Sequence, residues 1–179
     1  SHSNKNAVAI GESSTLYLYS KVAVQNICNY NKDAKFIIMI RNPIEIARSF
    51  HQVALKVFGE IETDFQKAWL LERNRKLGLK IPKGCIDSKL IFYGKIAKIG
   101  KQVERLLTKT SSDNTHFVLY DDFKRSTESE YIKILSFLNV KKEMPLNFLS
   151  YNKSQKIKSE TVTKLTNYAS YFKKKLKIK

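Results

Sequence analysis

The chain has 179 residues, 42% of them apolar, which is long enough for one domain with a buried core and too apolar for a disordered segment. Its 33 Lys and Arg outnumber its 16 Asp and Glu, and a net charge of +17 attracts nucleic acid, anionic membrane, sulfated glycan or a nucleotide cofactor without choosing among them. Two cysteines and three histidines show no metal-ligand spacing, so we expect neither a metal site nor a disulfide framework. Because no apolar run reaches the ~20 residues that span a bilayer, we expect a cytoplasmic protein with no membrane span.

The N-terminal part predicts a strand, a helix and a second strand. Residues 7–10 form a short apolar run typical of a strand, and Ser20 is placed to cap a helix that ends at Tyr30. Residues 35–40 are almost continuously apolar and rich in β-branched side chains. Such a run predicts a strand that is buried on both faces, as in a parallel sheet.

A helix is predicted directly after this strand. Asn42 suits the N-cap, Pro43 the first helical position and Glu45 the third. One apolar face follows at helical spacing, made of Ile46, Phe50, Val53 and Val57. Arg41 is therefore expected where a buried strand ends and a helix begins.

The rest of the chain continues the alternation of helices and strands. Asp64 is placed to cap a helix, residues 80–87 predict a loop, and residues 92–106 predict a longer helix. Residues 116–120 predict a further strand, with a helix from Thr127 onwards. This order predicts an α/β three-layer sandwich with a mostly parallel sheet. We expect one domain over residues 1–179, with a basic C-terminal helix or tail at 159–179.

The junction at Arg41 has the features of a phosphate site. Ligands of open α/β sheets lie beyond the carboxyl ends of the strands, and a helix N-terminus offers unpaired N–H groups and partial positive charge. Arg41 adds a fork of donors that fits phosphate oxygens. Asn42 and Ser49 lie seven residues apart and so share one helix face. The alternative is an arginine paired with a carboxylate and a serine that is merely near the cap.

Residues 35–49 resemble the 3′-phosphate-binding segment of sulfotransferases that use 3′-phosphoadenosine 5′-phosphosulfate (PAPS). That segment is an apolar strand followed by Arg-Asn/Asp-Pro and a Glu-Arg-Ala-x-Ser helix. The resemblance implies a P-loop-NTPase-like sulfotransferase fold, PAPS as donor, and binding of the 3′-phosphate by Arg41 and Ser49. Ile46 stands where the family usually has Arg, and Arg48 where an aromatic residue is common.

Residues 11–18 are similar to the family's Gly-Glu-x-Ser/Thr-Pro-x-Tyr-Leu segment, which lines the acceptor cleft. The resemblance places Glu12, Ser14 and Tyr17 on the acceptor side, and Glu12 is the candidate catalytic residue. Thr15 replaces the usual Pro. A solvated or structural carboxylate is the alternative for Glu12. The acceptor class stays open among glycans, lipids and small molecules.

Further matches follow in the C-terminal half. Residues 118–123 and 134–140 resemble a strand end and a helix end of the family, and they support the fold more than the chemistry. Residues 152–156 resemble the loop that closes over the cofactor, which implies that Lys153 and Lys156 contact phosphate. A solvated basic loop is the alternative for these two lysines.

The family's Gly-rich loop, whose Lys and Thr/Ser hold the 5′-phosphosulfate, has no counterpart in this sequence. We therefore expect an N-terminally truncated domain that is catalytically incomplete as it stands. The main alternative is a non-catalytic remnant that still binds the nucleotide. A basic nucleic-acid-binding module is supported only by net charge, without a recognition motif. A P-loop kinase relative is an analogy of fold alone.

Overall fold

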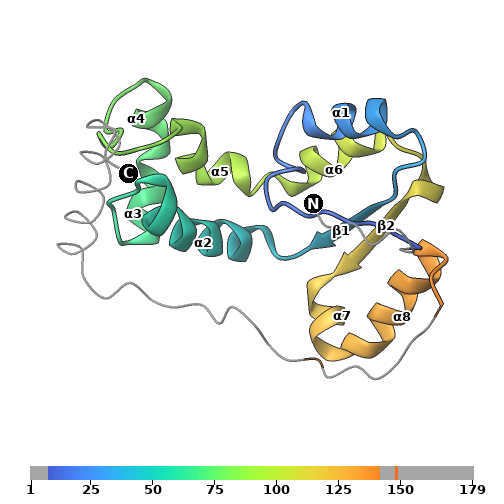
Figure 1. Ribbon diagram of the computed structural model, residues 1–179. Helices are drawn as coiled ribbons and strands as arrows, with labels where there is room; N and C mark the ends of the chain where they lie inside the picture. Colours follow the sequence, from blue (N-terminus) through green and yellow to red (C-terminus); the bar gives the residue numbers. More distant parts are fainter. Residues whose placement is uncertain (1–7, 142–147, 149–179) are drawn as a thin grey trace, which may run out of the picture. The chain divides into compact units, whose positions relative to one another are not determined.

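The computed structural model describes residues 8–141 and 148 (Figure 1). Residues 8–41 and 99–141, together with Phe148, form a first compact unit, and Asn42–Lys98 form a second. The prediction of one domain over residues 1–179 stays a prediction, and its basic C-terminal segment, 159–179, lies outside the described residues.

A parallel pair of strands lies at the centre of the first unit. Strand β1 (Phe36–Ile40) pairs with β2 (Thr115–Leu119), and the register runs from Phe36 opposite Thr115 to Ile40 opposite Leu119. Both predicted strands are confirmed. Parallel neighbours require a long crossover between them, and here the chain between β1 and β2 is mostly helical.

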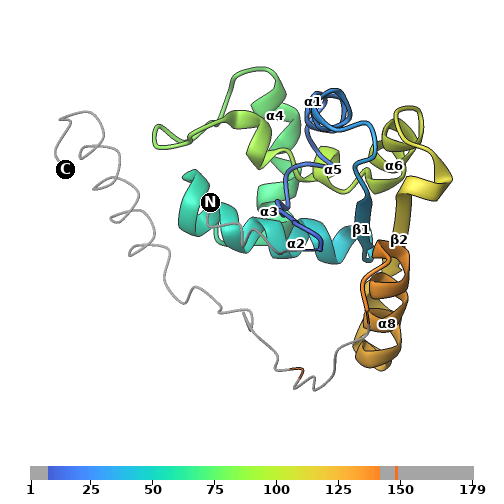
Figure 2. The ribbon, with the colours of Figure 1, turned by 45° about the vertical axis from the view of Figure 1, so that its right-hand side comes forward.

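Helices cover the sheet from both sides, as Figures 1 and 2 show. On one side lie α1 (Ala23–Tyr30) and α6 (Ile99–Leu107), and on the other lie α7 (Tyr120–Arg125) and α8 (Thr127–Leu138). The ring of His116 in β2 stacks on that of Phe137 in α8, with centroids 5.3 Å apart. This layered α/β arrangement confirms the predicted fold class.

Two strand predictions need correction. Residues 8–10 form no strand, and their apolar side chains face water, with Val8 84% and Ile10 75% exposed, because the described residues give this run no neighbouring strand. Strand β1 is not buried on both faces, since Ile37 is 40% and Met39 46% exposed. Within the described residues α8 packs over β2 on this face and leaves the β1 side open.

The second unit is helical. Helix α2 (Pro43–Val53) continues through a π-helical turn at Ala54–Phe58 and ends at Gly59, which has a left-handed φ of 81°. A Cβ on Gly59 would lie 2.2 Å from the carbonyl oxygen of Gly84, so this close approach requires glycine. The helices are α2 (Pro43–Val53), α3 (Phe65–Leu70), α4 (Glu72–Lys76), a 3₁₀ turn (Ser88–Ile91) and α5 (Tyr93–Ile96).

The single helix predicted over residues 92–106 is wrong. The chain instead forms α5 and α6, which are separated at Ala97 and Lys98. Ile96 is buried in the second unit and Leu106 in the first. The apolar face that predicted one helix therefore serves two cores, and the helix is interrupted between them.

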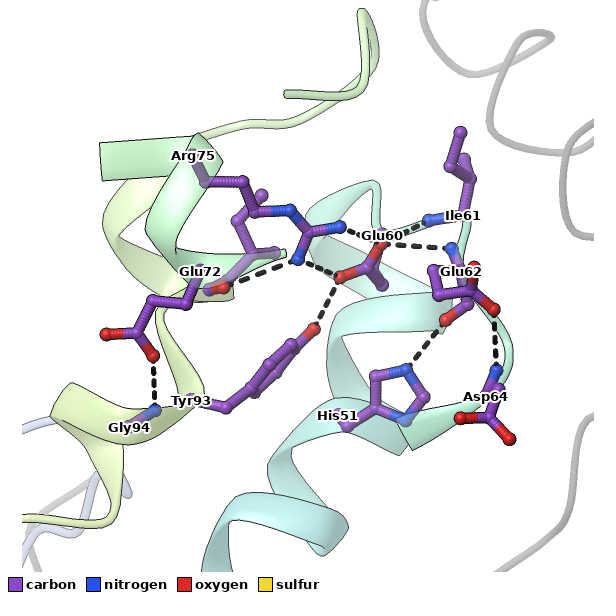
Figure 3. Close-up of polar contacts among 10 residues, drawn as sticks. His51, Glu60, Ile61, Glu62, Asp64, Glu72, Arg75, Tyr93 and Gly94 are labelled. Atoms are coloured by element: carbon purple, nitrogen blue, oxygen red, sulfur yellow. Dashed lines mark hydrogen bonds and ion pairs between the residues drawn. The ribbon is translucent and has the colours of Figure 1, made fainter. Parts of the chain in front are cut away.

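A network of buried polar groups organises the second unit (Figure 3). The fully buried Glu60 carboxylate accepts hydrogen bonds from Arg75 Nη1 at 2.6 Å and Nη2 at 2.8 Å, and from the Tyr93 hydroxyl at 2.8 Å. It also accepts from the backbone N–H groups of Ile61 and Glu62. Burial opposes ionisation of Glu60, but its bonds to Arg75 hold the pKa below its usual value. Arg75, Tyr93 and two backbone N–H groups together thus stabilise the buried carboxylate as an anion.

Candidate cofactor and acceptor site

The junction between β1 and α2 has the local structure that its sequence predicts. Asn42 is the N-cap, and its side-chain oxygen accepts a hydrogen bond of 2.9 Å from the N–H of Ile44. Pro43 is the first helical residue. Glu45 lies in the first turn, where its negative charge interacts favourably with the positive end of the helix dipole. The chain therefore leaves the sheet and starts an eleven-residue helix within three positions of Ile40.

Arg41 lies at the carboxyl end of the sheet, in the first unit. Its guanidinium carbon is 4.4 Å from the centre of the Tyr120 ring. Tyr120 follows Leu119 just as Arg41 follows Ile40, so the parallel register makes the two residues neighbours. This distance is that of a cation–π contact, so the Tyr120 ring helps to hold the Arg41 guanidinium in place at the end of the sheet.

Sequence analysis missed Tyr120 as part of this site. The residue was visible as the end of an apolar strand, but its relation to Arg41 depends on strand pairing. The two predicted strands have similar lengths, and each is followed by a residue with a large side chain. Pairing them in parallel register would have predicted the contact between Tyr120 and Arg41.

Ser49 lies on α2 in the second unit and is exposed. It is two helical turns beyond Asn42, on a face that does not take part in the core. The opposite face of α2 buries Ala47 and His51, and the His51 ring nitrogen Nε2 lies 2.7 Å from the carbonyl oxygen of Glu62. Helix α2 is thus fixed from behind, while its Ser49 side faces water.

On the acceptor side, the structure brings Glu12 and Tyr17 together. The Tyr17 hydroxyl donates to the Glu12 carboxylate, with 2.6 Å to Oε1, and also contacts Oε2. This hydrogen bond, more than burial or charge, raises the pKa of Tyr17. The pair is exposed, so a carboxylate and a phenol are presented to solvent as one unit.

Ser14 has a local role in the same segment. Its hydroxyl oxygen accepts a hydrogen bond of 3.2 Å from the N–H of Leu16, and its carbonyl accepts one from Tyr17. Ser14 therefore shapes the turn that leads to Tyr17. Lys153 and Lys156, the two predicted phosphate contacts of the C-terminal loop, lie outside the described residues.

A search of the described residues finds no group of three or more His, Cys, Asp or Glu that suits a metal ion. In residues 8–141 no helix has the length and apolar character needed to cross a membrane.

Comparison with known proteins gives the family. Residues 2–178 match the family model of the sulfotransferase domain. No curated protein matches the chain. Among solved structures, the crystal structure of a sulfotransferase from Alicyclobacillus acidocaldarius is similar, with a TM-score of 0.66 and 23% sequence identity. That alignment covers 93% of this chain and 64% of the other, so the chain spans less than two thirds of that structure. The shared fold and the match over nearly the whole length establish that this chain belongs to the sulfotransferase domain family.

Proposed function

We propose that the chain provides the 3′-phosphate-binding and acceptor-binding parts of a sulfotransferase, which transfers a sulfuryl group from PAPS to an acceptor hydroxyl or amine. The observation that carries the proposal is the junction where Arg41 follows β1 and Asn42 starts α2, within a chain that matches the sulfotransferase domain. The acceptor belongs to the glycans, lipids or small molecules.

Arg41 and Ser49 are the proposed ligands of the 3′-phosphate. The phosphate dianion gains from the arginine charge, from the Ser49 hydroxyl and from the positive end of α2. Asn42 contributes indirectly, because its cap sets where α2 begins. Lys153 and Lys156 are proposed to contact phosphate from the C-terminal side.

Glu12, Ser14 and Tyr17 are proposed to line the acceptor side, with Glu12 as the candidate base. In such a transfer the acceptor O–H or N–H loses its proton to the base. The acceptor atom forms a bond to sulfur while the bond from sulfur to the nucleotide phosphate oxygen breaks, and adenosine 3′,5′-bisphosphate leaves with the electron pair. The Tyr17 hydroxyl orients the Glu12 carboxylate toward this role.

The residues present fit one end of PAPS and not the other. Arg41, Ser49 and the α2 N-terminus suit a 3′-phosphate. The 5′-phosphosulfate needs a Gly-rich loop with Lys and Thr/Ser, and in the described residues the glycines with left-handed φ, Gly59 and Gly78, lie in no such loop. The second candidate function is a remnant of the family that binds the nucleotide without transfer. A basic nucleic-acid-binding module has no support besides the net charge of +17.

The test is thermal unfolding of the chain with adenosine 3′,5′-bisphosphate and with adenosine 5′-monophosphate, which lacks the 3′-phosphate. A ligand at 100 times its Kd adds about 2.7 kcal/mol to stability. We expect the bisphosphate to raise the melting temperature more than the monophosphate, and Arg41→Ala to remove the difference. Arg125→Ala, which removes an exposed arginine that forms an ion pair with Asp122, is the matched control.

Equal effects of the two nucleotides on the wild-type chain would contradict the 3′-phosphate site, and so would an undiminished difference in Arg41→Ala. If the bisphosphate binds as expected, transfer of ³⁵S-sulfate from PAPS to a glycan, lipid or phenol acceptor is measured with the full-length gene product, and this separates the enzyme from the non-catalytic remnant.

A further inference from the structure

One arginine holds the backbone of the segment that carries Glu12 and Tyr17. Arg105 lies on α6, and its Nη2 donates to the carbonyl oxygen of Leu18 at 2.6 Å and to those of Tyr19 and Ser20 at 3.2 Å each. The guanidinium and these carbonyls are 85 or more positions apart in the sequence. This contact therefore joins two distant parts of the first unit.

The held segment has little regular structure of its own. Residues 15–19 form a turn, in which the Ser20 N–H donates to the Leu16 carbonyl at 2.9 Å and the Tyr17 N–H to the Ser14 carbonyl at 3.4 Å. Three consecutive carbonyl groups that point toward one place repel one another through their dipoles. A cation at that place makes the interaction with the three oxygens attractive, and the two N–H groups of Nη2 are shared among them.

Arg105 is itself rigidly placed. Its neighbours on α6, Gln102 and Leu106, are buried in the first unit, so the backbone that carries the guanidinium is anchored. A lysine carries its nitrogen one bond closer to the backbone of α6 and on a more flexible stem, so its ammonium would not lie where Nη2 reaches the three oxygens. The contact therefore depends on arginine and not on positive charge alone.

We propose that Arg105 is the positioning residue of the acceptor side: it fixes the turn at Leu18–Ser20 and thereby holds the Glu12–Tyr17 pair in place. The proposal rests on the proposed acceptor role of Glu12 and Tyr17. Arg105 acts through the backbone and does not touch the reacting atoms.

The experiment compares wild type, Arg105→Ala, Arg105→Lys and the control Arg125→Ala in the 179-residue chain without ligands. Amide hydrogen exchange is followed at Ser20 in the held turn and at Asn26 inside α1. The environment of the Tyr17 ring is followed by its ¹³Cζ chemical shift during a pH titration. Each alanine variant is then measured again in millimolar guanidinium, which can enter the space left by the lost side chain.

We expect Arg105→Ala to accelerate exchange at Ser20 by about tenfold or more, because a hydrogen bond from a charged donor contributes more than a neutral one. Asn26 should change far less. The Tyr17 pKa should fall toward its ordinary value as the bond to Glu12 weakens. In Arg105→Lys the exchange rate at Ser20 should be close to that of Arg105→Ala. Added guanidinium should slow exchange at Ser20 in Arg105→Ala and leave it unchanged in Arg125→Ala.

The proposal is overturned if Arg105→Lys keeps wild-type exchange at Ser20 and the wild-type Tyr17 titration, since charge alone would then suffice. It is equally overturned if Arg105→Ala matches Arg125→Ala. If Arg105→Ala does not fold, the lysine variant decides. None of these measurements needs nucleotide, so failure of bisphosphate binding in the wild-type chain would contradict the proposed function and leave the result on Arg105 standing.

Discussion

Removing the Glu60 carboxylate should destabilise the second unit more than any single change on its surface. In Glu60→Met, the Arg75 guanidinium remains buried, with its residue only 2% exposed, and loses its counter-ion. Leaving such a charge uncompensated costs about 3–5 kcal/mol. The Tyr93 hydroxyl and the N–H groups of Ile61 and Glu62 also lose their acceptor. Because whole domains are stable by only about 5–15 kcal/mol, the variant should lose a large share of its free energy of unfolding.

The partner substitution should cost less. In Arg75→Met the Glu60 carboxylate keeps the hydrogen bonds from the Tyr93 hydroxyl and from the two backbone N–H groups. It can also take up a proton once the arginine no longer lowers its pKa. The double variant Glu60→Met/Arg75→Met should be more stable than Glu60→Met alone, because no buried charge remains.

Urea unfolding followed by tryptophan fluorescence measures these differences in the right place. The chain has one tryptophan, Trp69, which lies in α3 of the second unit. Its ring packs edge-on against that of Phe65, with the ring centroids 5.6 Å apart. Asp122→Ala is the control, because an exposed ion pair contributes about 0–1 kcal/mol. A loss below about 1 kcal/mol in Glu60→Met would refute the reasoning, since that is the range of a surface pair. An Arg75→Met loss equal to or larger than that of Glu60→Met would refute it as well.

Three further variants or conditions test other parts of the second unit by the same fluorescence titration. Asn42→Ala should cost about 1 kcal/mol through loss of the N-cap, and no loss would mean that α2 does not depend on it. Gly59→Ala should cost more than about 1 kcal/mol, because φ is 81° and the new Cβ would meet the Gly84 carbonyl. Burial lowers the pKa of His51 in the folded chain below the ordinary value of about 6.5. Between these two values the unfolded chain therefore binds more protons than the folded chain. Stability should therefore fall as pH drops from about 7 toward the lower folded value, and His51→Gln should remove this part of the slope.

The junction at Arg41 could be predicted from the sequence because its structure is set by neighbours in the chain. The N-cap bond at Asn42 joins its own side chain to an N–H only two residues later, and Pro43 at the first helical position needs no partner. An apolar run followed by these two residues therefore predicts a strand that leads directly into a helix. The structure confirms β1, the cap at Asn42 and the start of α2. The roles of Arg41 and Ser49 toward phosphate stay predictions.

The network around Glu60 could not be predicted in this way. A glutamate in a loop and an arginine in the basic stretch of α4 are usually solvated, and nothing local distinguishes this pair from the other charges of the chain. Their burial depends on how α4, α5 and the turn after Gly59 meet, which is a property of the folded unit. The same limit applies to residues 92–106, where one apolar pattern serves two cores.

The 33 lysines and arginines show why net charge was a poor guide to function in this chain. Arg41, Arg75 and Arg105 have the same side chain but different surroundings. Arg41 makes a cation–π contact with Tyr120, Arg75 directs two nitrogens at a buried carboxylate, and Arg105 directs one nitrogen at three carbonyl oxygens. A lysine can supply the same positive charge to the long-range electrostatic field of the protein. It does not reproduce the contacts that these three guanidinium groups make. Substitution by lysine should therefore separate structural and binding arginines from those that contribute only to the overall charge.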